Sequence, residues 1–185
     1  MGMRKTHQIV RKIAATVVAF SASAVIAAAS EPVKSGFAWG ADVGGAVDMG
    51  SDGMSTVNID AYCGLKCPYL EVAGIGAGIN VPVNNSTRTF PIYGIIRSSM
   101  SRTPQKVFGE LRAGCVVNDR TSGKSTCDFF CSPAIGFRLA YSATYSSYIA
   151  LGYIYNGMHG KGYSDSEEID INGAHLAVVR LGIYF

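Results

Sequence analysis

The sequence predicts an all-β protein, an eight-stranded antiparallel up-and-down transmembrane β-barrel preceded by a cleavable signal peptide. Three observations lead to this fold class. The chain opens with an export-type apolar segment, the remainder holds eight runs of about ten residues separated by polar turns, and the final run ends on an aromatic residue. Runs of this length match the roughly 9–11 residues with which a tilted strand crosses a bilayer.

Residues 1–30 have the composition of a signal peptide. Basic residues within the first twelve positions precede a charge-free run that ends in small residues. These are the parts of a secretory signal. An uncleaved anchor is the alternative, but the run is rich in Ala, Ser and Thr and has fewer strongly apolar residues than a membrane helix requires. We therefore expect cleavage near residue 30, a short segment at 31–37 and a barrel domain at 38–185.

Removing residues 1–30 changes the charge of the chain. Four of the sixteen Lys and Arg residues and none of the thirteen acids lie there, so the remaining 155 residues carry a net charge of −1. No basic patch is left to bind nucleic acid. The length fits one domain, and no cofactor is expected.

The first two expected strands, 38–48 and 57–66, sort into two faces. In 57–66 the odd positions are apolar or small and the even positions are mostly polar, so one face is expected to meet lipid and the other the lumen. By this parity Asp42 and Asp60 point inward. The third strand, 69–80, does not sort, because its alternating glycines share a face with Leu and Val while the other face holds Glu, Ala and Ile. Either face could meet lipid.

The fourth and fifth strands, 89–98 and 106–117, add charged residues to the lumen. Alternation in 106–117 places Glu110 and Arg112 opposite an apolar face. The run 89–98 alternates poorly, and Arg97 is placed inward by its charge.

The last three strands are expected at 129–140, 147–156 and 174–185. Parity places Arg138 and Arg180 inward. The final strand has a continuous apolar face and a terminal aromatic residue, as expected of a closing strand between lipid and a polar interior. The expected C-terminal membrane-assembly signal consists of Val179, Leu181, Ile183 and Phe185.

Seven charged residues are therefore predicted to form an ion-pair network in the barrel interior. They are Asp42, Asp60, Arg97, Glu110, Arg112, Arg138 and Arg180. An eight-stranded lumen is narrow enough to be filled by its own side chains, and buried charges must pair, so we expect a plugged polar interior and no open pore.

The connections between the strands differ in length at the two ends of the barrel. With the N-terminus in the periplasm, the inner connections are short, and the outer ones are longer. The outer set is 49–56, 81–88, 118–128 and 157–173, and its last member is expected to be a solvated loop. This asymmetry is typical of outer-membrane barrels.

The chain resembles the small eight-stranded outer-membrane β-barrel proteins of the OmpA/OmpX type, and most of all the outer-membrane β-barrel domain common in Bacteroides-type bacteria. The resemblance rests on FAWGADVGG at 37–45, NIDAY at 58–62, GIGAG at 74–78, IY at 92–93 with RSS at 97–99, and LGIYF at 181–185. It implies an outer-membrane location and contact with outer-membrane lipid and the barrel-assembly machinery. It implies no particular chemistry.

The expected role is therefore non-catalytic, structural or in surface recognition and adhesion, with any surface ligand bound by the outer loops. An acyl hydrolase or acyltransferase acting on outer-membrane lipid is an alternative, since such enzymes occur on similar barrels. Its candidate parts are His159, Ser164, Asp165, Ser166, Glu167, Glu168 and His175. However, Ala177 stands where a lipid A deacylase of this shape would carry its Ser. A soluble periplasmic barrel that binds an apolar ligand is the other alternative.

Five cysteines, an odd number, leave at least one unpaired within the chain. Cys115 could bridge to either Cys127 or Cys131 across an outer hairpin, whereas Cys63 and Cys67 flank a turn and could lie close together. A zinc site built from four cysteines is the competing interpretation, but the cysteines fall on different strands and at opposite ends of the barrel. We expect no metal.

Overall fold

The computed structural model describes the barrel part of the protein. The described residues are 35–50, 54–83, 88–99, 105–118, 126–142, 144–164 and 167–185. The predicted signal peptide lies outside them. Within these ranges no helix has the length and apolar character needed to cross a membrane.

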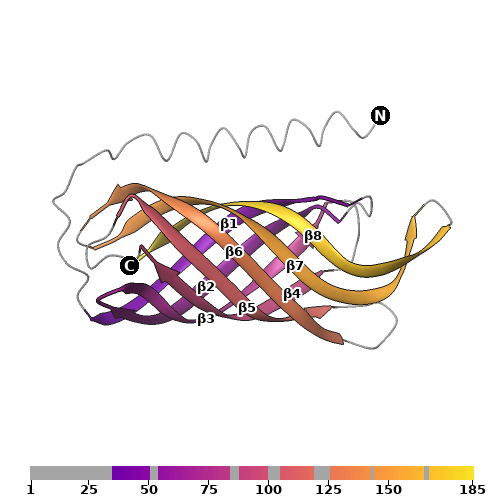
Figure 1. Ribbon diagram of the computed structural model, residues 1–185, viewed down its shortest axis with the longest axis horizontal. Helices are drawn as coiled ribbons and strands as arrows, with labels where there is room; N and C mark the ends of the chain where they lie inside the picture. The colour runs from indigo at the N-terminus through magenta and orange to yellow at the C-terminus, as the bar shows by residue number, and fades with distance from the viewer. Residues whose placement is uncertain are drawn as a thin grey trace.

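Eight antiparallel strands form one closed barrel, which confirms the predicted fold class. Each strand pairs with its neighbours in chain order, and β8 pairs with β1 to close the sheet (Figure 1). The strands are β1 (Gly36–Asp48), β2 (Thr56–Cys67), β3 (Leu70–Pro82), β4 (Thr89–Ser98), β5 (Val107–Asn118), β6 (Thr126–Tyr141), β7 (Ser146–Ser164) and β8 (Glu167–Tyr184).

Period-two alternation sets the two faces of the wall. In β2, Val57 and Ile59 are exposed while Asn58 and Asp60 are buried. Because successive side chains of a strand point to opposite faces, the whole apolar set of β2 lies on the outer surface of the barrel. The same pattern recurs along β4, where buried and exposed residues alternate from Thr89 onward.

A β-bulge explains why the sequence of the third strand does not sort into two faces. Leu65 of β2 pairs with Ala73 and Cys67 pairs with Leu70, so β3 carries one extra residue between these two pairs. At the bulge both Glu71 and Val72 are buried. Beyond it, normal alternation turns the glycines inward and the Ile and Ala side chains toward the outside.

The inward glycines of β3 make room for aromatic side chains. A Cβ at Gly76 would overlap the ring of Tyr93, and a Cβ at Gly78 would overlap the carboxyl group of Asp60. These positions therefore require the absence of a side chain because large interior groups cross the lumen at their level.

The last outer connection was expected to be a loop, and this expectation is wrong. β7 and β8 continue to pair from His159 opposite Asn172 to Ser164 opposite Glu167, which makes a long hairpin that extends past the other strands (Figure 1). Gly173 joins this extension to the barrel wall with a φ of 93°, a conformation that favours glycine. Polar and apolar residues alternate at 168–172, which is the strand signal that the loop interpretation overlooked.

One cysteine expectation is also wrong. Cys63 and Cys67 both lie on β2 and do not flank a turn between strands. Four residues of extended strand separate them by roughly 13 Å, well beyond disulfide reach.

Candidate functional site

The seven charged residues predicted for the lumen all lie in the barrel interior. They come from six strands: Asp42 from β1, Asp60 from β2, Arg97 from β4, Glu110 and Arg112 from β5, Arg138 from β6 and Arg180 from β8. Arg97, Glu110 and Arg112 meet within the β4–β5 hairpin, where Arg97 pairs directly with Glu110, and the closing of the barrel brings the residues of β1, β2 and β8 to them.

Glu110 is the centre of this network. Its carboxylate accepts hydrogen bonds from Arg97 Nε at 2.9 Å, from Arg112 Nε at 2.7 Å and from Arg180 Nη1 at 3.2 Å. Arg97 also donates a second hydrogen bond, from Nη2, to the same carboxylate. Three guanidinium groups thus share one fully buried carboxylate, an arrangement suited to the planar donor fork of arginine.

Arg112 links Glu110 to a pair of aspartates. Asp42 and Asp60 face each other directly in the β1–β2 register, which would be unfavourable for two carboxylates alone. Arg112 Nη2 lies 2.6 Å from Asp42 Oδ2, and Arg112 Nη1 lies 3.5 Å from Asp60 Oδ2. The guanidinium therefore offsets the like-charge repulsion between the two aspartates.

Tyrosine hydroxyls complete the hydrogen bonding of these carboxylates. Tyr148 Oη donates to Asp42 Oδ2 at 2.9 Å, and Tyr93 Oη donates to Asp60 Oδ1 at 3.0 Å. Charged groups buried in a narrow lumen need such partners because each unsatisfied one carries a large desolvation cost.

Arg97 is held by aromatic rings as well as by Glu110. Its guanidinium carbon lies 4.1 Å from the ring centre of Tyr148, 4.8 Å from that of Phe108, 5.0 Å from that of Tyr184 and 5.2 Å from that of Tyr62. Four rings around one cation fill the section of the lumen at this level and add cation–π attraction.

Glu71, which the sequence interpretation did not assign to the lumen, forms a separate ion pair with Arg138 near the end of the barrel where β2 and β3 are joined. Tyr184 Oη donates to Glu71 Oε2 at 3.2 Å. Glu71 raises the number of interior acids to four, equal to the four arginines. The sequence signal for the inward position of Glu71 was that its strand does not sort into two faces, which is the pattern that a bulge produces.

The rest of the interior, between the ionic residues and the end of the barrel that carries the long β7–β8 hairpin, has mostly neutral buried side chains. Toward the outer end the buried side chains are mostly apolar, and they are Ala46, Val116, Phe130, Ile154, Ala174, Leu176 and Val178. Four buried neutral polar residues lie among them, namely Asn58, Asn80, Thr89 and Asn156. Asn58 donates to Asn80 at 2.7 Å, and Asn80 donates to Thr89 at 3.1 Å. The interior therefore has an ionic layer and a neutral layer of mixed apolar and amide side chains in series.

The four residues of the expected membrane-assembly signal lie on the outer face of β8 and just beyond it. Val179 and Ile183 are exposed, and Leu181 is half-buried. Phe185 stacks on Trp39 with ring centres 4.4 Å apart, and its backbone N–H donates to the Trp39 carbonyl oxygen at 2.8 Å. The end of the chain thus completes the wall at β1.

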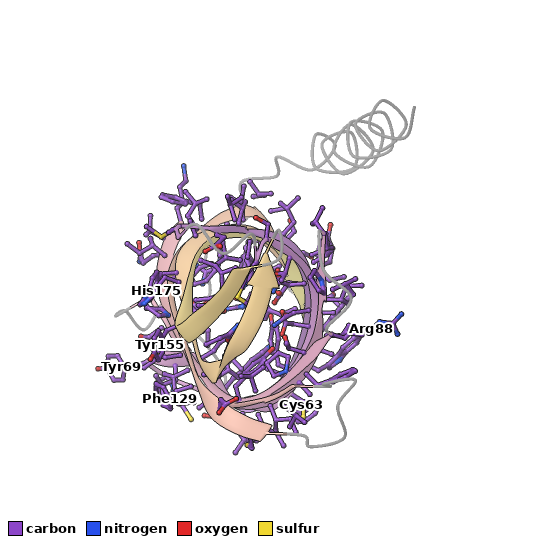
Figure 2. The ribbon with its side chains drawn as sticks, turned by 90° about the vertical axis from the view of Figure 1, so that its right-hand side faces the viewer. Cys63, Tyr69, Arg88, Phe129, Tyr155 and His175 are labelled. Carbon is purple, nitrogen blue, oxygen red and sulfur yellow. The ribbon has the colours of Figure 1, made fainter. Side chains whose placement is uncertain are left out.

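The structure describes the side chains of only some of the residues expected for an acyl hydrolase. His175 lies on the outer wall, where its Nδ1 is hydrogen-bonded to the hydroxyl of Tyr153. Its ring packs against Tyr155, which in turn packs against Phe129, and Figure 2 shows the three side chains along one side of the barrel. The side chains of His159, Ser164 to Ser166, Glu167 and Glu168 lie outside the described ones.

No protein-family model matches this chain, and no curated protein matches it by sequence. Neisserial surface protein A, an outer-membrane β-barrel, has a similar structure with a TM-score of 0.58 and 13% identity, over 82% of this chain and 97% of that one. The designed protein TMB2.3 has a TM-score of 0.39 and 14% identity, over 80% and 91%. Ail of Yersinia pestis, solved with the heparin analogue sucrose octasulfate, has a TM-score of 0.37 and 11% identity, over 84% and 100%. The likeness to the Neisserial protein shows that the fold is that of an outer-membrane barrel.

Proposed function

We propose that this chain is an integral outer-membrane barrel with an interior plugged by its own side chains, and that it acts in a structural or surface-recognition role without catalysis. Outer-membrane lipid and the barrel-assembly machinery are its proposed partners. The observation that carries the proposal is the inversion of polarity across the wall. The fully buried charged side chains, four carboxylates and four guanidinium groups, lie inside, and the outer face is apolar.

The outer face supports insertion into a bilayer. Large apolar side chains stand exposed on every strand; Ile75, for example, is 69% exposed and Leu65 61%. A continuous apolar surface of this extent is not tolerated on soluble monomers. Aromatic residues gather near both ends of the wall, with Trp39 and Phe185 at the periplasmic end and Phe129 near the outer end, as expected of side chains at the two membrane interfaces.

The interior supports a closed barrel. The side chains of Arg97, Arg112 and Arg180 are almost fully buried, and together with the tyrosines they fill the ionic layer. The neutral layer next to the ionic one is occupied mainly by apolar side chains such as Phe130 and Leu176. Passage of ions or solutes would require both layers to open at once.

The recognition role is proposed for the outer end. The longest strands, β7 with 19 residues and β8 with 18, extend nearly twice as far as the 10 residues of β4. At roughly 3.3 Å per residue this leaves a hairpin that projects past the wall by a few tens of ångströms. Such a hairpin is the part of the protein best placed to meet a surface ligand.

A three-part experiment tests this proposal. First, the membrane fraction is run on a detergent gel unboiled and boiled; a closed barrel is expected to give a heat-dependent mobility shift. A protein found soluble in the periplasm without detergent would overturn insertion and favour the ligand-binding alternative. Second, the purified protein is added to planar bilayers, where no steady ion conductance is expected. Stable open channels would refute the plugged interior.

The third part tests recognition with a hairpin variant. Residues 158–172 are deleted so that Gly157 joins Gly173, and binding of the expressing cells to host-matrix proteins and host cells is compared with that of the full-length protein. The heat-dependent shift of the variant serves as the control for folding. Unchanged binding by a folded variant would remove the hairpin from any recognition role and leave the structural one.

A further inference from the structure

The β5–β6 hairpin brings two thiols together on the outer face of the barrel. Cys115 pairs with Phe129, and Cys127 pairs with Val117, so the two cysteines are diagonal neighbours across the strand pair. Both side chains lie on the outer face, and the two thiols share a hydrogen bond. Diagonal partners of this kind lie roughly 7–8 Å apart across an antiparallel pair and somewhat closer at their Cβ atoms, so a disulfide between them requires a small movement of the strand ends.

The other cysteines are less well placed. Cys131 is also a diagonal neighbour of Cys115, since it pairs with Ala113 on the other side of the Phe129 position. The two diagonals are equivalent in sequence spacing, but the right-handed twist of a sheet brings one closer than the other. The thiol–thiol hydrogen bond identifies Cys127 as the closer partner.

We propose that Cys115 and Cys127, which are free thiols in this structure, are oxidised to a disulfide in the exported protein and so close the outer β5–β6 connection covalently. The inference rests on the proposed export of the chain, because disulfides form and persist in oxidising compartments. Cys131 then stays a thiol beside the bond.

The oxidant is a disulfide-bearing protein of the export compartment. The thiolate of one cysteine attacks that disulfide, which forms a mixed disulfide and releases one thiolate of the oxidant. The thiolate of the second cysteine then attacks the cysteine sulfur of the mixed disulfide and releases the other thiolate. The two protons lost by the cysteines end on the oxidant, which is reduced by two electrons as the pair is oxidised.

Tryptic cleavage makes the bond measurable. Cleavage after Arg112 and Arg120 isolates Cys115 in peptide 113–120, and cleavage after Lys124 and Arg138 isolates the other two cysteines in peptide 125–138. Full-length protein is taken from the membrane fraction, alkylated under denaturing conditions and digested without reductant. The two peptides are expected as one species lighter than their sum by two hydrogens, and the species should separate on reduction.

Two matched serine variants assign the bond. Cys131→Ser is expected to keep the linked species, and Cys127→Ser to lose it with Cys115 recovered alkylated. Alkylated Cys115 in the unmodified protein would overturn the proposal, as would a linked species that persists in Cys127→Ser. The heat-dependent gel shift of the same samples reports barrel insertion separately. A shifted barrel with free thiols would therefore refute the disulfide and leave the proposed function standing.

Discussion

Replacement of Glu110 by Gln is the most direct test of the interior network. The substitution keeps the size of the side chain but removes the one charge that Arg97, Arg112 and Arg180 share. The four interior acids become three against four arginines, so the lumen gains one uncompensated positive charge. The amide nitrogen also presents a donor to guanidinium groups that can only donate.

The expected cost follows from the burial of the group. Breaking a buried ion pair by removing one partner typically costs about 3–5 kcal/mol, because the remaining charge is left without compensation. Glu110 has three such partners and no access to water, so we expect a loss at the upper part of this range. Since 1.4 kcal/mol is about a factor of ten, the folding equilibrium should fall by roughly three orders of magnitude.

The assay is urea unfolding of the protein folded into lipid vesicles. Trp39 is the only tryptophan of the chain, is 51% exposed on the outer wall and stacks on Phe185. Its fluorescence therefore reports on the closing of the barrel, and its side chain does not contact the interior network. A lower urea midpoint with an unchanged slope is the expected result.

A second substitution distinguishes charge balance from a general packing defect. In the background of Glu110→Gln, Arg180→Gln restores equal numbers of interior charges, and the double variant should be more stable than the sum of the two single losses predicts by about 1 kcal/mol or more. A loss below about 1 kcal/mol for Glu110→Gln, or strictly additive losses, would refute the reasoning.

Three further predictions concern the wall. A Cβ at Gly182 would overlap an interior tyrosine ring, whereas a Cβ at Gly94 meets only atoms at 3.7 Å or beyond, so Gly182→Ala should cost about 1–3 kcal/mol in urea unfolding while Gly94→Ala stays near neutral. Deletion of Phe185 should lower the membrane yield and shift the fluorescence of Trp39; an unchanged yield would count against an assembly role. Ile59→Arg should lower stability in vesicles by about 2–4 kcal/mol if that face meets lipid, and equal stability would contradict the lipid-facing assignment.

Much of the fold could be predicted because a strand has a period of two. In β2 the alternation of Val57, Asn58, Ile59 and Asp60 determines which residues face outward once the strand lies in a barrel wall. The expected strand bounds agree with the observed ones within a few residues for the first five strands. They fail for β7 and β8, where pairing continues beyond the membrane-spanning length as a hairpin.

The inward positions of the charged residues also follow from parity, but not all of their partners do. Arg112 shares one face of β5 with Glu110, and Arg97 is the direct partner of Glu110 in the β4–β5 pair, so these two contacts arise within one hairpin. The contact of Arg180 with Glu110 joins β8 to β5 across the lumen and arises only when the barrel closes. Glu71 shows the complementary limit, since a single extra residue in β3 reverses the parity on which its assignment depends.

The sequence alone therefore determined the strand count, the sidedness of most strands and the resemblance to exported barrels, since these depend on local composition and a two-residue period. The tertiary structure decided the bulge that brings Glu71 inside, the neutral layer beside the ionic one and the contact of Arg180 with Glu110 across the lumen. These features depend on register, twist and closure, which arise from contacts between strands and leave no periodic signal within any one of them.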